Sequence, residues 1–168
     1  MGKTIFITGG ARSGKSAVAE ARVTALGSPA VYIATAEAGD DEMAARIARH
    51  QSRRGTEWKT VEEPMALTRA LDDTDGDGPR LVDCLTLWLS NLLLAGADWE
   101  AAGKELVAAL AIQESPVVLV SNEVGAGIVP ENALARAYRD AAGLLNQQVA
   151  AVADEAILVV AGLPVQLK

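Results

Sequence analysis

The feature that most constrains the fold is a glycine-rich segment near the start of the chain, GGARSGKS at residues 9–16. It fits the pattern G-x-x-x-x-G-K-[ST] at every fixed position. It also follows an apolar run at residues 4–8 and precedes a helix-like stretch at 14–26. Glycines at these places let backbone N–H groups turn toward phosphate oxygens, and a helix start adds the positive end of its dipole. The order strand, loop, helix therefore predicts an α/β domain that binds a nucleoside triphosphate.

Every residue of this phosphate loop is a predicted nucleotide contact: Gly9, Gly10, Ala11, Arg12, Ser13, Gly14, Lys15 and Ser16. The Lys15 ammonium is expected to reach the β- and γ-phosphates and to act in catalysis, whereas the Ser16 hydroxyl is expected to hold Mg²⁺. The alternative is a glycine-rich strand-to-helix turn that only resembles the motif. The motif itself predicts triphosphate binding and leaves the reaction open.

Short aliphatic runs alternate with helix-like stretches along the rest of the chain. Predicted strands are residues 4–8, 30–35, 80–84, 117–121 and 156–161, with a weaker one at 58–62 and a terminal one at 165–167. Predicted helices lie near 14–26, 40–53, 64–72, 86–95, 98–112 and 130–153. Most of the strands are apolar throughout, which is typical of parallel strands buried on both faces. The pattern predicts one domain, residues 1–168, with a mostly parallel, doubly wound sheet flanked by helices.

Charge and cysteine content indicate which partners and which cellular compartment to expect. The formal net charge of −7 repels phosphodiester backbones, so nucleic acid is not the expected partner. No apolar run approaches the roughly 20 residues that a membrane helix needs. The single cysteine, Cys84, has no partner for an intramolecular disulfide, which indicates a reducing compartment. We therefore expect a cytoplasmic protein without a membrane span.

An acidic residue at a strand end is needed to hold the metal that accompanies a bound triphosphate. Asp83, which closes the run Leu81-Val82-Asp83, is best placed, and Glu123, just after the predicted strand 117–121, is its rival. Either residue could instead cap the helix that follows it.

A separate acidic segment, residues 73–78, imitates the start of a calcium loop. Because its twelfth position is Cys84 rather than a bidentate Glu, it is predicted to be a solvated turn.

A cationic stripe is predicted on the helix near residues 40–53. At 100° per residue, Arg46, Arg49, His50, Arg53 and Arg54 fall within an arc of about 140°. One interpretation is a solvated helix face. The other is a triphosphate clamp in which neighbouring cations lower the pKa of His50 and keep the ring neutral and nucleophilic. His50 is the only histidine in the chain, so imidazole chemistry has no other candidate.

The sequence resembles a known family, the bifunctional adenosylcobinamide kinase and adenosylcobinamide-phosphate guanylyltransferases of cobalamin biosynthesis. The resemblance extends from end to end. It rests on GGARSGKS at 9–16, YIATA at 32–36, DEM at 41–43 followed by Arg46, Ile47 and His50, WKTVE at 58–62, DCLTLW at 83–88, NEVGAGIVP at 122–130 and AGLP at 161–164. A generic phosphate-loop protein shares only the first of these motifs.

The resemblance implies a two-step catalyst. The cobinamide hydroxyl attacks the γ-phosphate of ATP or GTP, and a histidine, here His50, then takes GMP from GTP and passes it to cobinamide phosphate. Nucleotide contacts are implied at Ile33, Ala34, Thr35, Gln51, Ser52, Arg53, Arg54, Glu62 and Asp83. The resemblance also implies a RecA-type sheet and assembly as a trimer. Guanine selectivity rests on the resemblance alone.

Several marked residues carry weaker predictions. Gly125 and Gly127 could let a backbone approach a large corrinoid or could form an ordinary strand-to-helix turn. Pro130 suits the first turn of the next helix. Arg136 and Asp140, spaced i, i+4, are predicted to form a surface ion pair. Trp88 is predicted to be a core residue rather than a corrinoid platform, and Cys84 a buried free thiol.

Two other functions stay open on the sequence. One is a kinase-only enzyme in which His50 is structural. The other is a nucleotide-switched assembly protein, such as a RecA-like ATPase that acts on DNA, against which the acidic charge argues. Covalent labelling by GTP separates the first alternative from a guanylyltransferase, and DNA-stimulated hydrolysis would identify the second.

Overall fold

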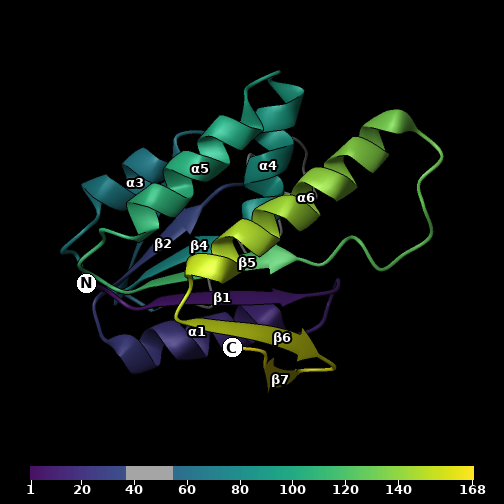
Figure 1. The fold of residues 1–168 in the computed structure, drawn as a ribbon. Helices are drawn as coiled ribbons and strands as arrows, with labels where there is room; N and C mark the ends of the chain where they lie inside the picture. Colours follow the sequence, from purple (N-terminus) through teal and green to yellow (C-terminus); the bar gives the residue numbers. More distant parts are fainter. Residues whose placement is uncertain (37–54) are drawn as a thin grey trace.

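The sheet dominates the architecture. The computed structural model describes residues 1–36 and 55–168. In these residues seven strands form one sheet in the order β3-β2-β4-β5-β1-β6-β7 (Figure 1). The strands are β1 (Thr4–Gly9), β2 (Ala30–Ala34), β3 (Trp58–Glu62), β4 (Arg80–Asp83), β5 (Val117–Asn122), β6 (Glu155–Val160) and β7 (Leu163–Gln166). All pairings are parallel except that of β7 with β6. A parallel sheet places the carboxyl ends of β1 to β6 along one edge, where ligands bind in such folds.

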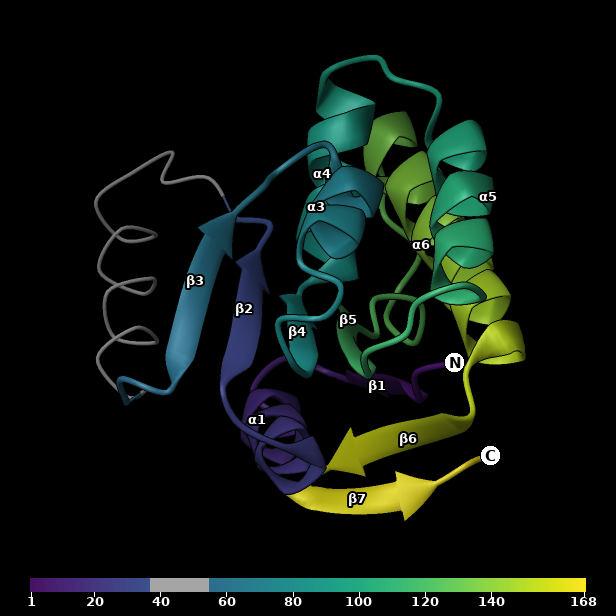
Figure 2. The same cartoon turned by 90° about the vertical axis from the view of Figure 1, so that its left-hand side faces the viewer.

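Helices cover both faces of this sheet. They are α1 (Lys15–Leu26), α3 (Leu67–Asp73), α4 (Leu85–Leu94), α5 (Trp99–Leu110) and α6 (Ala133–Val152). Helix α1 packs against β1, β4, β5 and β6 on one face. The other four lie together on the opposite face, as the turned view shows (Figure 2). The predicted α/β class, with a mostly parallel, doubly wound sheet flanked by helices, is confirmed.

Burial on both faces explains why the strands are apolar throughout. In β1, Phe6 joins the core beneath α3 to α6, whereas Ile5 and Ile7 join the core beneath α1. Successive side chains of a strand point to opposite faces, so each face needs its own apolar set. By contrast β3, at the sheet edge, is half exposed, which is why its pattern is weaker.

Most predicted boundaries agree with the structure to within a few residues, and one differs for a clear reason. The last long helix was expected to include Pro130 in its first turn, but α6 begins at Ala133. Asn132 is its N-cap, with a side-chain oxygen that accepts from the Ala135 amide at 2.7 Å. Pro130 therefore belongs to the preceding loop. The helix predicted at 40–53 lies outside the described residues.

The acidic segment at 73–78 is a turn, as predicted, but one of its carboxylates is structural. Asp75 accepts hydrogen bonds from the Glu114 and Ser115 amides and pairs with the buried Arg80. Arg80 also donates to the Gln113 side chain. This cluster ties two loops together at the amino end of the sheet, opposite the phosphate loop. Within the described ranges, no helix has the length and apolar content needed to cross a bilayer.

Candidate nucleotide-binding site

The phosphate loop occupies the carboxyl end of β1, in the middle of the sheet. Its first residue, Gly9, lies in register with Asn122 of β5. The chain then turns sharply: the Ser13 amide donates to the Gly10 carbonyl at 3.2 Å, and Arg12 and Gly14 adopt φ values of 55° and 93°. Helix α1 begins at the next residue, Lys15. Strand, loop and helix follow in the order that a phosphate site requires.

Packing explains the two fixed glycines of the motif. A Cβ atom on Gly9 would lie 2.5 Å from the Val159 carbonyl oxygen. On Gly14 it would lie 3.0 Å from Gly162 Cα, at a φ that favours glycine. The Gly162 amide donates to the Ser13 carbonyl at 2.7 Å, so the turn between β6 and β7 supports the loop from below. Gly10, at a variable position of the motif, faces open space.

The Lys15 side chain lies against the phosphate loop. The residue is only 9% exposed, and its Nζ donates to the Gly10 carbonyl at 3.0 Å. Two hydroxyls nearby, Thr8 Oγ1 and Ser13 Oγ, are buried without a hydrogen-bond partner in the part of the chain that the structure describes. Buried polar atoms are normally paired, and a polar ligand is one way to satisfy them. The loop and the strand before it thus combine a largely buried ammonium with two hydroxyls that have no partner among the described residues.

Asp83 lies two strands from the phosphate loop, at the carboxyl end of β4, and is oriented by a neighbour. The Tyr32 hydroxyl donates to Asp83 Oδ2 at 2.9 Å. The other oxygen, Oδ1, has no hydrogen-bond partner among residues 1–36 and 55–168. Tyr32 sits on β2, so the contact crosses from one strand to the next. One carboxylate oxygen is thereby fixed, and the other remains available.

The rival acid, Glu123, has a different environment. Its amide donates to the Gly9 carbonyl at 2.9 Å, while its exposed side chain accepts from the Gly125 amide of its own loop. Neither acid caps a helix: the N-cap of α4 is Cys84, and that of α6 is Asn132. The capping alternative is therefore wrong for both residues. The geometry favours Asp83 as the acid with a free, oriented oxygen.

The donor atoms on hand suit Mg²⁺. Ser16, in the first turn of α1, offers a hydroxyl and Asp83 a carboxylate, and Mg²⁺ prefers such hard oxygen ligands. The described residues contain no group of three or more His, Cys, Asp or Glu side chains suited to a metal. An ion held by these two side chains would take its remaining ligands from substrate phosphates and water, as Mg²⁺ commonly does.

The other predicted nucleotide contacts are less close to the loop. Ile33 and Thr35 are fully buried, and Ala34 is 5% exposed. Thr35 Oγ1 accepts from the Cys84 amide and donates to the Cys84 carbonyl, each at 2.8 Å, so it braces the end of β2 against that of β4. Glu62 is exposed at the end of β3, four strand spacings from β1, or about 19 Å away.

Five predicted site residues lie outside the described residues: His50, Gln51, Ser52, Arg53 and Arg54. The remaining ones divide into two groups. The phosphate loop and Asp83 lie along the same sheet edge within two strands of each other. Glu62 is on the same edge but distant from Lys15, so the structure does not bring these two together.

Sequence reasoning missed a polar network beside the loop. Asn122 Nδ2 donates to Thr86 Oγ1 at 2.8 Å, and Tyr138 donates to the Thr86 carbonyl at 3.0 Å. These contacts join the end of β5 to α4 and α6. Burial raises the pKa of the Cys84 thiol at the centre of this network, as does the charge of Asp83. The signal that could have revealed it is the polar pair Ser121-Asn122 that ends an otherwise apolar strand.

Three further predictions are settled nearby. Cys84 is a buried free thiol, as predicted. Trp88 is 2% exposed and its indole donates to the Met65 carbonyl, which confirms a core role. The predicted ion pair of Arg136 with Asp140 is wrong: Asp140 pairs with Arg139, and Arg136 donates instead to the backbone of the preceding loop.

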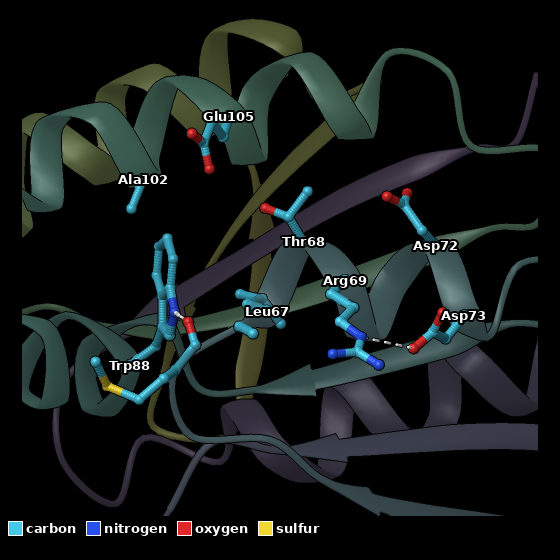
Figure 3. Close-up of a pocket in the computed structure, with 10 residues that line it drawn as sticks. Leu67, Thr68, Arg69, Asp72, Asp73, Trp88, Ala102 and Glu105 are labelled. Atoms are coloured by element: carbon cyan, nitrogen blue, oxygen red, sulfur yellow. Dashed lines mark hydrogen bonds and ion pairs between the residues drawn. The ribbon is translucent and has the colours of Figure 1, made fainter.

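An open cavity of about 420 Å³ lies elsewhere, between α3 and α5 (Figure 3). Thr68 and Arg69 of α3, Ala102 and Glu105 of α5 and one edge of Trp88 line it. Arg69 is paired with Asp73 across 3.4 Å. Since no residue of the phosphate loop contributes to this cavity, it is not the nucleotide site.

Comparison with known proteins decides the family. Residues 5–167 match the family described as cobinamide kinase / cobinamide phosphate guanyltransferase. The chain belongs to this family. The bifunctional adenosylcobalamin biosynthesis protein CobP of Pseudomonas aeruginosa is 47% identical, over 97% of this chain and 96% of that protein. The corresponding CobU protein of Salmonella typhimurium is 46% identical, over 98% of this chain and 99% of that protein.

Membership of the cobinamide kinase / guanyltransferase family makes this chain a bifunctional enzyme of cobalamin biosynthesis. Its fold is also found outside the family. The ATPase EscN of the enteropathogenic E. coli type III secretion system superposes with a TM-score of 0.63 at 12% identity, over 95% of this chain and 43% of that one. This similarity concerns the fold alone and agrees with the predicted phosphate-loop NTPase fold.

Proposed function

We propose that the chain phosphorylates adenosylcobinamide with ATP or GTP and then transfers GMP from GTP to the product, through a guanylyl-histidine, to give adenosylcobinamide-GDP and pyrophosphate. One observation carries this proposal: in a member of the cobinamide kinase / guanyltransferase family, the loop at 9–16 has glycines where packing demands them and Lys15 folded across it. Both steps need a polyphosphate held at this loop.

In the kinase step, the acceptor hydroxyl oxygen attacks the γ-phosphorus of the triphosphate. A new P–O bond forms, the bond between the γ-phosphorus and the β,γ-bridging oxygen breaks, and the diphosphate leaves. The hydroxyl proton passes to solvent or to a base. Backbone amides of residues 9–16 and the Lys15 ammonium stabilise the negative charge that builds on the phosphate oxygens.

In the guanylyl step, an imidazole nitrogen of His50 attacks the α-phosphorus of GTP. The P–N bond forms, the bond to the α,β-bridging oxygen breaks, and pyrophosphate leaves. A phosphate oxygen of adenosylcobinamide phosphate then attacks the same phosphorus, and the P–N bond breaks to release the neutral imidazole. The motif spacing and the single histidine support His50 in this role, with Gln51, Ser52, Arg53 and Arg54 beside it as nucleotide contacts.

Ser16 and Asp83 are the residues that would hold Mg²⁺, which would neutralise phosphate charge. The Asp83 oxygen that has no hydrogen-bond partner in the described part of the chain supports this role. Ile33, Ala34, Thr35 and Glu62 complete the proposed nucleotide contacts. A homotrimer in the cytoplasm, acting on a corrinoid and not on nucleic acid, remains our expectation. Sedimentation of the purified protein tests the trimer.

Covalent labelling tests the proposal directly. The protein is incubated with Mg²⁺ and GTP labelled at the α-phosphate, and denatured protein is assayed for bound label. We expect acid-labile label on the wild type, none on His50→Ala, and normal transfer of γ-phosphate to adenosylcobinamide by that variant. Label retained by His50→Ala would remove His50 from the mechanism. If the wild type takes no label but phosphorylates the acceptor, the chain is a kinase only.

A further inference from the structure

The residues that follow β5 leave the sheet directly beside the phosphate loop. Asn122 lies in register with Gly9, and the Glu123 amide donates to the Gly9 carbonyl at 2.9 Å. From there the chain forms a long loop, residues 123–132, that projects from the end of β5 before it returns to α6 (Figure 1). Whatever reacts with a phosphate at residues 9–16 therefore has this loop as a neighbour.

The loop presents apolar side chains to solvent. Ile128 is 98% exposed, Val129 58% and Leu134, in the first turn of α6, 61%. Together with Val124 they form what we call the apolar arm. Isolated exposed aliphatic residues are ordinary on protein surfaces, but several in one loop that leaves the sheet beside the phosphate loop are typical of a binding surface.

Hydrogen bonds hold both ends of the loop that carries the arm. Arg136 Nη1, one turn into α6, donates to the Pro130 carbonyl at 2.9 Å and to the Glu131 carbonyl at 2.6 Å. Asn132 caps the same helix. These bonds anchor the far end of the loop, and the bond of Glu123 to Gly9 anchors its near end. Both ends of the loop are thus held, the near end at the phosphate loop and the far end at α6.

We propose that the apolar arm binds the corrinoid macrocycle of the acceptor and so positions its hydroxyl, or its phosphate, at residues 9–16. This inference rests on the proposed function and adds the surface that recognises the acceptor. The macrocycle is large and carries methyl groups on its periphery, so only a small part of it can enter the phosphate site. The rest must lie on neighbouring surface, and the arm is apolar and belongs to the loop that begins beside that site. Gly125 and Gly127 keep its backbone accessible.

Side-chain replacement in the arm tests this inference without risk to folding, because Ile128 makes almost no contact with the protein. Ile128→Ser, alone and with Val129→Ser, is compared with Ile112→Ser. Ile112 is 72% exposed but follows α5 at the amino end of the sheet, next to Gln113, whose carbonyl accepts from Gly2. Ile112→Ser therefore makes the same isoleucine-to-serine change at an exposed site near the amino end of the sheet, away from the phosphate loop.

We expect the arm variants to raise KM for cobinamide in the kinase step about tenfold or more, with kcat and KM for the nucleotide within about twofold of wild type. Equilibrium dialysis of cobinamide, read from its visible absorbance, should show the same loss of affinity. Ile112→Ser should change neither. All variants are assayed at a concentration where sedimentation shows the wild-type oligomer.

Two results would overturn the inference. Cobinamide affinity within about twofold of wild type in the double variant would leave the arm without a role in acceptor binding. An oligomer lost in the arm variants at every concentration would assign the surface to a second copy of the chain. In either case a wild type that still phosphorylates cobinamide leaves the proposed function intact, so the two failures are distinguishable.

Discussion

The Tyr32 hydroxyl donates a hydrogen bond to Asp83 Oδ2 across 2.9 Å, which links two side chains 51 residues apart in the sequence. The bond fixes one oxygen of the carboxylate and leaves the other without a hydrogen-bond partner among the described residues. A carboxylate that must hold a cation gains from being oriented in advance, because no rotation is then lost on binding. Tyr32 is therefore a positioning residue for Asp83.

Tyr32→Phe removes only the hydroxyl. We expect the Mg²⁺ concentration for half-maximal activity to rise about 3- to 10-fold, because Asp83 loses its fixed orientation. Isothermal titration of Mg²⁺ into the complex with a non-hydrolysable triphosphate should show the same shift. Tyr138→Phe is the matched control: its hydroxyl donates to the Thr86 carbonyl, not to an acid, and its Mg²⁺ dependence should stay that of wild type. An unchanged titration for Tyr32→Phe would leave this contact a structural one.

The fold could be predicted from the sequence because its signals are local. Strands buried on both faces are mostly apolar, as in β1, whose six residues are all buried. The glycines of residues 9–16 predict a strand-to-helix turn. The start of α6 was less predictable. Pro130 and Asn132 both suit a helix start, and only the hydrogen bond from the Ala135 amide to Asn132 decides between them.

Lys15→Ala should impair both reactions, because both depend on the same polyphosphate cradle. The expected loss is at least about 3 kcal/mol of transition-state stabilisation, or roughly a hundredfold in kcat/KM for each step. Rates of γ-phosphate transfer and of enzyme guanylylation are measured separately. Lys104→Ala, an exposed site on α5, controls for loss of a positive charge and should keep both rates. Near-normal phosphorylation by Lys15→Ala would contradict the scheme.

The candidate site was only partly predictable, since much of it depends on contacts between distant residues. Asp83 could be selected because it closes an apolar strand, but nothing near it in the sequence indicates Tyr32. Similarly, Arg136 and Asp140 have ideal helical spacing, yet the guanidinium bonds to carbonyl groups of the loop before the helix. A backbone acceptor carries no sequence signal, so spacing favoured the wrong partner.

Asp75 should contribute stability that depends on pH. Burial opposes ionisation, but the amides of Glu114 and Ser115 and the charge of Arg80 bring the pKa of this carboxyl below its ordinary value. A lowered folded-state pKa means that the stabilisation is complete above the unfolded value of about 3.9 and is lost as the pH falls through the folded one. Asp75→Asn should therefore be less stable than wild type at pH 7, and the difference should shrink below about pH 4.

Urea unfolding at a series of pH values measures this difference in the free energy of unfolding. Asp73→Asn is the control, because its carboxylate is exposed on α3 and pairs only with exposed Arg69. We expect it to cost less than about 0.5 kcal/mol. If Asp75→Asn were as stable as wild type at pH 7, the Arg80 cluster would not be the tie between the two loops that the geometry indicates.

Arg136→Ala should weaken acceptor binding through the position of the apolar arm. The substitution removes both bonds to the Pro130 and Glu131 carbonyls, so the loop loses its far anchor while its apolar side chains remain. We expect KM for cobinamide to rise about 3- to 10-fold, with KM for the nucleotide unchanged, and amide hydrogen exchange at 123–132 to quicken. Arg136→Lys keeps the positive charge but replaces the planar guanidinium by a compact ammonium on a more flexible stem, and should give an intermediate effect.

The matched control for this change lies one turn along the same helix. Arg139 pairs with Asp140 at 3.6 Å and makes no bond to the loop among the contacts of the described residues, so Arg139→Ala removes the same charge without releasing the anchor. It should keep the wild-type exchange rate at 123–132 and the wild-type KM for cobinamide. A rise in KM that is equal in the two variants would mean that α6 acts through its charge, and the arm would no longer need to be held in place for the acceptor to bind.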